Sequence, residues 1–182
     1  MKDDLLKIGI ILGSTREGRV SPSVGNWVKD LATQRGDALY ELIDIKEYHL
    51  PLLGESSDIS GISRWNQKLA TLDGFVFVLP EYNHSIPAAL KNALDSAKEV
   101  WNNKAAGIVS YGSAGGARSA EHLRGILGEL QIADVRTQIL LSLFNDFENF
   151  TTFKPLSVHQ VNLTVLLDQL LTWSKALKTV RS

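Results

Sequence analysis

The sequence contains no cysteine, and this absence removes several kinds of chemistry at once. Disulfides, cysteine-ligated zinc, iron–sulfur clusters and thiol catalysis are excluded. The four histidines are dispersed along the chain, and no pair has the i, i+4 spacing of a common metal-binding motif. We therefore expect no metal site. His122 falls on a predicted helix and is expected at the surface or at an interface rather than in catalysis.

The sequence also lacks an excess of charge and any long hydrophobic run. Nineteen basic residues stand against 20 acidic ones, and no basic cluster is interleaved with aromatic residues, so we expect no nucleic-acid partner. No apolar run approaches the ~20 residues of a membrane helix. The N-terminal residues are too polar for a signal peptide. These features predict a cytoplasmic protein without a membrane partner.

What is present is an ordinary globular composition. Apolar residues make up 44% of the 182 residues and charged residues 21%, which predicts a single domain over residues 1–182. Short, β-branched apolar runs alternate with segments of helical periodicity. The predicted strands are 8–12, 39–45, 75–79, 105–109 and 135–141. This alternation predicts an α/β fold with a parallel sheet covered on both faces. The second strand alternates in polarity, as an edge strand does.

The four tryptophans are expected mostly in the core. Trp101 falls just beyond the end of a predicted helix, so it is also a candidate for a subunit contact.

Hydroxyl and guanidinium groups gather in the loop that follows the first strand. They belong to Ser14, Thr15, Arg16, Arg19 and Ser21. A helix follows, and its N-terminal N–H groups and dipole attract anions. This combination predicts a site for a terminal phosphate. The alternative is a solvated loop whose serines cap the helix.

Two familiar motifs fail to match. In the P-loop pattern, Arg19 stands where the lysine belongs and Val20 replaces the magnesium-binding hydroxyl, which disfavours nucleotide hydrolysis. The nucleophile-elbow pattern requires a glycine two residues before Ser113, but Tyr111 is there. The first loop does not match the dinucleotide fingerprint either.

The loop after the third strand runs from Pro80 to Pro87 and is suited to a flat ligand. Proline stiffens the backbone. Tyr82 offers an aromatic face, and Asn83 offers a donor and an acceptor for the edge of a heterocycle. Alternatively, Tyr82 is a core residue and Asn83 or Ser85 is a helix cap.

The loop after the fourth strand, 110–116, is rich in glycine, with Gly112, Gly115 and Gly116. Glycine lets the backbone approach a ligand closely, although the same composition is typical of a flexible turn. Loops at the carboxyl ends of parallel strands converge, so we expect all three loops to form one site.

Taken together, the three loops resemble those of the NAD(P)H-dependent FMN reductase family of flavodoxin-like proteins, which includes azoreductases, quinone reductases and chromate reductases. The matching segments, in the family's order, are 13–16 (Gly-Ser-Thr-Arg), 80–87 (Pro-Glu-Tyr-Asn-His-Ser-Ile-Pro) running into 90–95, and 115–118 leading to 122–124. The resemblance covers about residues 7 to 145. Its most specific element is the Pro-Glu-Tyr-Asn block with its helix.

The resemblance implies a flavodoxin-like three-layer sandwich with strand order 2-1-3-4-5. It implies that Ser14, Arg16 and a residue near Ser21 hold the FMN phosphate. The residues implied to line the isoalloxazine are Pro80, Glu81, Tyr82 and Asn83. Those implied at the pyrimidine end are Ser110 and the glycines after it, including Gly112 and Gly115. Members of the family are usually dimers or tetramers.

The expected function is an FMN-dependent oxidoreductase that takes hydride from NAD(P)H and passes electrons to a small acceptor. Quinones, azo compounds, metal oxyanions and free flavin are all candidate acceptors. The chemistry belongs mostly to the cofactor, so we assign no catalytic side chain. Two alternatives stay open: a flavodoxin-like electron carrier, against which the near-neutral charge counts, and a phosphosugar or nucleotide binder without flavin.

Overall fold

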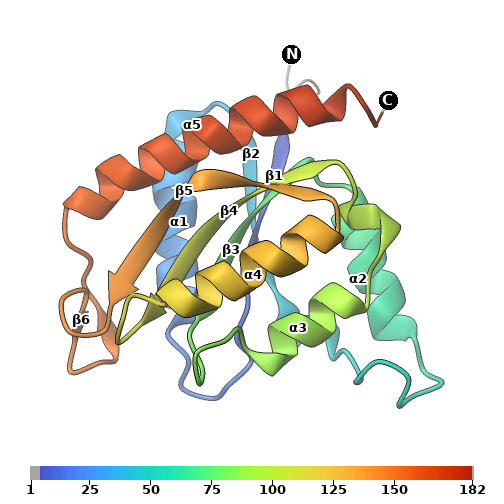
Figure 1. Ribbon diagram of the computed structural model, residues 1–182, viewed down its shortest axis with the longest axis horizontal. Coiled ribbons are helices and arrows are strands. Elements are labelled where there is room, and N and C mark those ends of the chain that lie inside the picture. The colour runs from blue at the N-terminus through green and yellow to red at the C-terminus, as the bar shows by residue number, and fades with distance from the viewer. Residues whose placement is uncertain (1–4, 182) are drawn as a thin grey trace.

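Five parallel strands form the central sheet of the protein (Figure 1). The computed structural model describes residues 5–181. The strands are β1 (Lys7–Leu12), β2 (Leu39–Asp44), β3 (Gly74–Pro80), β4 (Lys104–Gly112) and β5 (Ile132–Ser142). Their order is β2-β1-β3-β4-β5, which confirms the predicted α/β fold and strand order. The direction of winding reverses between β1 and β3, which is where open parallel sheets bind ligands.

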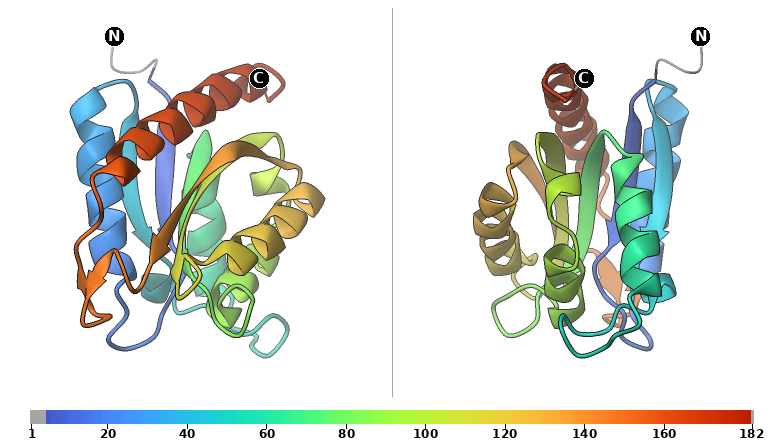
Figure 2. Two further views of the ribbon diagram at one scale, coloured as in Figure 1. Left: turned by 60° about the vertical axis from the view of Figure 1, so that its left-hand side comes forward. Right: turned by 90° about the vertical axis from the view of Figure 1, so that its right-hand side faces the viewer.

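Helices cover both faces of this sheet and create three layers (Figure 2). One face carries α1 (Ser21–Arg35) and α5 (Val158–Lys178). The other carries α2 (Ser60–Ala70), α3 (Ala88–Asp95) and α4 (Ala117–Glu129). The remaining elements are two 3-10 turns, η1 (Ile45–Tyr48) and η2 (Glu99–Trp101), and a hairpin of β6 (Phe147–Glu148) and β7 (Thr152–Phe153). No helix in this range combines the length and the apolar character that a bilayer crossing requires.

Each face of the sheet has its own hydrophobic core. Successive strand residues point to opposite faces, so Ile10 and Val76 pack under α1 and α5, whereas Ile11 and Phe75 pack under α2, α3 and α4. Because both faces are covered, β3 and β4 are buried along their whole length. The edge strand β2 is only partly buried, which agrees with its alternating sequence.

The predicted strands differ from the observed ones mainly at β4 and β5. β4 continues three residues beyond its predicted end at Val109, so Ser110 and Gly112 lie in the strand rather than in the predicted loop, because the backbone of β4 continues to pair with β3 and β5.

The other difference is at the start of β5. This strand begins at Ile132, three residues before the predicted start at Val135, and includes the polar Asp134. An ion pair between Asp134 and Arg124 of α4 makes the carboxylate tolerable in an edge strand. A shift in the β4–β5 register near Ala106 accompanies this irregular segment.

Trp101 lies in the core, as expected for most of the tryptophans, and is not the subunit contact that was the alternative. Its side chain is fully buried against Phe75, with ring centroids 5.0 Å apart. Its indole N–H donates to the carbonyl oxygens of Ala97 and Leu94, at 3.1 and 3.2 Å. Trp65 is also buried, as expected, whereas Trp173 on α5 is half exposed.

A buried lysine lies at the amino end of β4, far from the loops discussed above. The Lys104 Nζ donates to the Leu69 carbonyl oxygen at 2.7 Å and lies 5.6 Å from the centre of the Phe75 ring. Burial, with a smaller contribution from the nearby Arg181 cation, lowers the pKa of Lys104 to about 8.

This lowered pKa makes the stability of the protein dependent on pH. Between pH 8 and about 10.5 the unfolded chain holds a proton on Lys104 that the folded chain has lost. The free energy of unfolding should therefore rise with pH across this window, by up to about 1.4 kcal/mol per unit. Urea unfolding at pH 7.5, 8.5 and 9.5 measures the slope. Lys104→Met should flatten it, and an equally steep slope in this variant would contradict the assignment.

Candidate functional site

The loop between β1 and α1 holds a concentration of hydrogen-bond donors. The Ser14 hydroxyl is buried and lies 3.0 Å from the Tyr82 hydroxyl of the next loop. Gly18 has a φ of 66°, a conformation that glycine adopts at no steric cost. The turn it forms leads into α1, whose first turn contains Pro22 and no acidic residue. The positive end of the helix is therefore uncompensated.

Two side chains at the junction of this loop and α1 have buried polar atoms whose hydrogen-bonding capacity the described part of the chain does not fill. The fully buried Ser21 hydroxyl interacts with the Tyr111 hydroxyl, which lowers the Tyr111 pKa against the effect of burial, and it has no other partner there. Arg19 pairs with Asp44 through one terminal nitrogen, but its Nε and its other terminal nitrogen are buried without an acceptor. Buried polar groups are almost always satisfied, so these donors indicate an anionic ligand. Arg16 is exposed beside them, with its guanidinium carbon 5.8 Å from the centre of the Tyr82 ring.

The loop after β3 is held in shape by its own hydrogen bonds. Tyr82 and Ser85 exchange backbone hydrogen bonds of 3.0 Å in both directions. Between them, Asn83 and His84 adopt positive φ angles of 50° and 66°. Asn83 is exposed at the tip of this turn. His122 of α4 is exposed, as predicted, and its Nδ1 lies 3.0 Å from the Ser85 hydroxyl.

Glu81 connects this loop to the one after β4. Its backbone N–H donates to the Tyr111 carbonyl oxygen at 2.9 Å, and its carboxylate accepts hydrogen bonds from the backbone and side chain of Arg118. Burial would raise the pKa of Glu81, but the hydrogen bonds from Arg118 outweigh it and lower the pKa. Glu81 is therefore ionised at neutral pH, and its carboxylate is already engaged.

The loop after β4 is shaped by glycines. Gly115 and Gly116 have φ angles of 68° and 74°, which favour glycine. The fully buried Ser110 hydroxyl donates to the Gly115 carbonyl oxygen at 2.9 Å, and the Gly115 N–H donates to the Gly112 carbonyl oxygen at 3.0 Å. Ser110 and Gly115 thus shape the loop, while its exposed tip is Ser113 and Ala114.

A cavity of about 330 Å³ lies where these three loops meet. Five of the predicted site residues line it: Arg16, Pro80, Glu81, Tyr82 and Gly112. Ser14, Ser21, Ser110, Gly115 and Asn83 are not among the lining residues. Ser14 belongs to the β1–α1 loop and Ser21 is the first residue of α1, and we call this segment (14–21) the donor-rich loop. Ser110 and Gly115 support the β4–α4 loop, and Asn83 is at the tip of the β3–α3 loop.

Sequence reasoning missed other parts of the cavity lining. Tyr111 is the penultimate residue of β4, and burial raises the pKa of its hydroxyl well above the usual value. Leu143, Phe150 and Thr151 come from the segment after β5, where the sequence carried no recognised motif.

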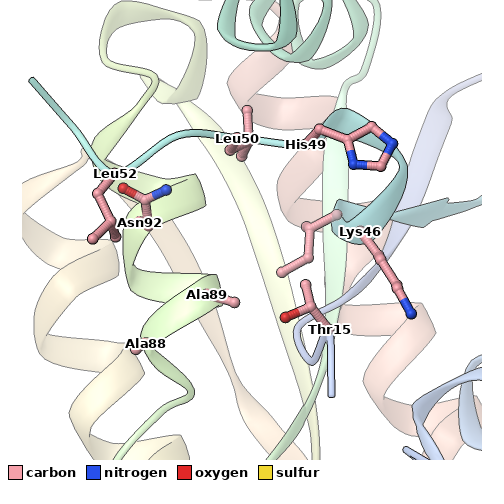
Figure 3. A pocket seen from close by; sticks show the side chains of 9 residues that line it. Thr15, Lys46, His49, Leu50, Leu52, Ala88, Ala89 and Asn92 are labelled. Carbon is pink, nitrogen blue, oxygen red and sulfur yellow. The ribbon is translucent and has the colours of Figure 1, made fainter. Parts of the chain in front are cut away.

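A second cavity, of about 410 Å³, lies on the other side of the β1–α1 loop (Figure 3). Thr15 lines this cavity rather than the first, and its hydroxyl points toward Ala89 of α3. At the far end, the Asn92 side chain donates to the Pro51 carbonyl oxygen at 2.8 Å and accepts from the Leu53 N–H at 3.1 Å. Asn92 therefore fixes the loop after η1 against α3. None of the ten predicted cofactor residues lines this cavity.

No group of three or more His, Asp or Glu side chains within residues 5–181 is arranged to hold a metal ion.

Comparison with known proteins agrees with this geometry. The profile of the NADPH-dependent FMN reductase family matches residues 6–146. A curated NAD(P)H-dependent FMN reductase of Schizosaccharomyces pombe is 38% identical over 149 residues, which cover 77% of this chain and 74% of the relative. A quinone reductase of Escherichia coli K12 is 32% identical over 130 residues, covering 67% and 69% of the two chains.

Solved structures show the same fold. The flavoenzyme NAD(P)H:(acceptor) oxidoreductase of Paracoccus denitrificans superposes with a TM-score of 0.76 at 17% identity, over 94% of this chain and 98% of that one. The flavodoxin-like architecture predicted from the resemblance is thereby confirmed. Because the family profile spans all three loops and the sheet that positions them, the chain belongs to the NADPH-dependent FMN reductase family.

Proposed function

We propose that this chain binds FMN in the cavity between the three loops and uses it to reduce quinones with hydride from NAD(P)H. The observation that carries the proposal is the pair of buried Arg19 nitrogens without an acceptor, with the buried Ser21 hydroxyl and the exposed Arg16 beside them at the start of α1. A phosphate monoester is dianionic near neutral pH and matches this donor set in charge and in hydrogen bonding.

The phosphate end of the site would use the β1–α1 loop. Arg16 would supply a charge-assisted hydrogen bond, and Ser14 and Ser21 would supply hydroxyls. Arg19 is held by Asp44, so its remaining N–H groups are oriented before any ligand arrives. Such preorganisation lowers the entropic cost of binding.

The ring end would lie against one wall made of Pro80 to Asn83 and the adjoining Tyr111 and Gly112, because Pro80 pairs with Tyr111 in the sheet and the Glu81 N–H donates to the Tyr111 carbonyl oxygen. Glycine at residue 112 lets the loops after β3 and β4 pack closely, because a Cβ atom there would lie 3.2 Å from both the Glu81 Cβ and the Gly116 backbone nitrogen. Pro80 is the buried last residue of β3. Because proline fixes its own φ angle, this wall of the site is stiff. The exposed backbone of Ser113 and Ala114 would offer N–H groups to the pyrimidine end and stabilise negative charge there.

When bound, FMN supplies the hydride-accepting and electron-donating chemistry of the reaction. The chain positions the reactants and sets the electrostatics. Glu81 is engaged by Arg118, and Tyr111 keeps its proton because burial raises the pKa of its hydroxyl. Neither side chain is suited to act as a proton donor or acceptor near pH 7, and the mechanism assigned here requires none.

Quinones are the acceptor class we favour. The E. coli relative is named a quinone reductase, and a relative from Burkholderia sp. is named a 2-hydroxy-1,4-benzoquinone reductase. A steady-state screen tests this choice: NADH and NADPH are each combined with a benzoquinone, an azo dye, chromate and free FMN. We expect the highest kcat/KM with the quinone. A quinone rate no higher than that without enzyme would contradict the proposal.

We also propose that the protein is a homodimer or homotetramer and acts in the cytoplasm. Leu52, Leu53 and Ile59, each more than half exposed, provide apolar surface in the segment before α2 and at its start. Use of a nicotinamide donor fits a cytoplasmic location. Light scattering during gel filtration measures the assembly, and a mass near 20.0 kDa would contradict the oligomer.

A further inference from the structure

The β6–β7 hairpin contributes an aromatic side chain to the cavity from outside the segment that the family profile matches. The profile ends at residue 146, whereas Phe150 and Thr151 line the cavity together with Arg16 and Tyr82. Phe150 is 57% exposed, and its ring meets that of Phe144 edge to face with centroids 5.6 Å apart. A large apolar ring is thus displayed at the cavity with much of its surface unburied.

The backbone conformation of Phe150 is unusual for its residue type. The turn from Glu148 to Thr151 is closed by a 3.1 Å hydrogen bond, and its central residues, Asn149 and Phe150, have φ angles of 51° and 61°. Such turns favour Asn followed by Gly, because positive φ is strained for residues with a bulky side chain. Phenylalanine replaces the expected glycine at an energetic cost, and strain of this kind concentrates at ligand-binding sites.

The base of the hairpin is firmly anchored. The buried carboxylate of Asp146 accepts backbone hydrogen bonds from Ser142 and Leu156, at 2.8 and 3.0 Å, and lies 2.9 Å from Nε2 of His159. Phe147 is buried against the Tyr111 ring of the cavity wall, with centroids 6.0 Å apart. The strained residue is therefore presented from a rigid support.

We propose that the β6–β7 hairpin is a second wall of the FMN site and that the Phe150 ring packs against the bound cofactor. This inference rests on the function proposed above. The contact is apolar, so it strengthens the binding of FMN and of riboflavin alike. In this respect it differs from the contact made by Arg16, which depends on the phosphate.

Phe150→Gly tests this role, because glycine suits the turn and removes the ring. We expect the ligand-free variant to unfold at the wild-type temperature or above it, since the strain is relieved. Its dissociation constants for FMN and riboflavin, measured by quenching of flavin fluorescence, should both rise about three- to tenfold. Phe150→Tyr should restore wild-type affinity for both ligands.

Asn149→Gly is the matched control, because it places glycine at the neighbouring position with the same backbone conformation and keeps the ring. It should leave both dissociation constants unchanged. Wild-type affinity in Phe150→Gly, or an equal loss in Phe150→Tyr, would overturn the assignment while leaving the proposed function intact. A wild-type protein that fails to bind FMN would overturn both.

Discussion

Arg16→Ala should weaken FMN binding about ten- to hundredfold, because it removes a charge-assisted hydrogen bond to the phosphate worth about 1.5–3 kcal/mol. Arg16 is the exposed cation of the donor-rich loop, whereas Arg19 is already paired with Asp44. Riboflavin has no phosphate, so its affinity should be almost the same in the variant and the wild type. Titrations that follow flavin fluorescence measure all four dissociation constants.

The matched control is Arg136→Ala, which removes an exposed arginine of β5 that does not line the cavity. It should leave FMN affinity unchanged at moderate ionic strength. The assignment of Arg16 would be wrong if Arg16→Ala bound FMN as tightly as the wild type, or if riboflavin affinity fell by the same factor.

Gly116→Ala should destabilise the protein by about 2–4 kcal/mol, because two costs add together. The φ angle of 74° strains any residue with a Cβ atom, and that atom would lie 2.7 Å from both the Ser110 Cβ and the Tyr111 backbone nitrogen. The melting temperature should fall by roughly 5–15 °C. FMN affinity should fall as well, since the displaced residues shape the ring end of the site.

Gly125→Ala makes the same chemical change inside the helix that follows Gly116, and its expected effect on stability has the opposite sign. Gly125 lies inside α4, and nothing lies within 4 Å of the Cβ atom that alanine would add. Alanine should therefore stabilise the helix by about 0.5–1 kcal/mol. Thermal unfolding of the two variants side by side checks the pair. Similar melting temperatures in both would show that the β4–α4 loop tolerates a side chain at residue 116.

The sheet could be predicted from the sequence because helices cover both faces of a parallel sheet and bury its central strands. A parallel strand covered on both faces needs a nearly continuous apolar run, and β3 and β4 have one. The exceptions were the end of β4, where Ser110 to Gly112 have a loop-like composition, and the start of β5, where Asp134 interrupts the apolar pattern. Its carboxylate is stabilised by Arg124 of a different element, and local sequence does not reveal such long-range pairing.

The candidate site was predictable to the extent that it is local. A phosphate site in the donor-rich loop could be predicted because Ser14 and Arg16 lie between a predicted strand and a predicted helix. The resemblance placed Glu81 and Ser110 at the ligand. In the structure the Glu81 carboxylate accepts from Arg118 of α4, and the Ser110 hydroxyl donates to Gly115 within the β4–α4 loop. Phe150 could not be predicted, because a two-residue β6 strand and a strained turn leave no periodic signal.

The cavity between the three loops should hold FMN within reach of a nicotinamide. Anaerobic mixing of the FMN-loaded protein with NADPH, and separately with NADH, tests this arrangement. The yellow absorption of the bound flavin should be lost within seconds to minutes with at least one donor and should return when a benzoquinone is added. Bound flavin that stays yellow with both donors would contradict it.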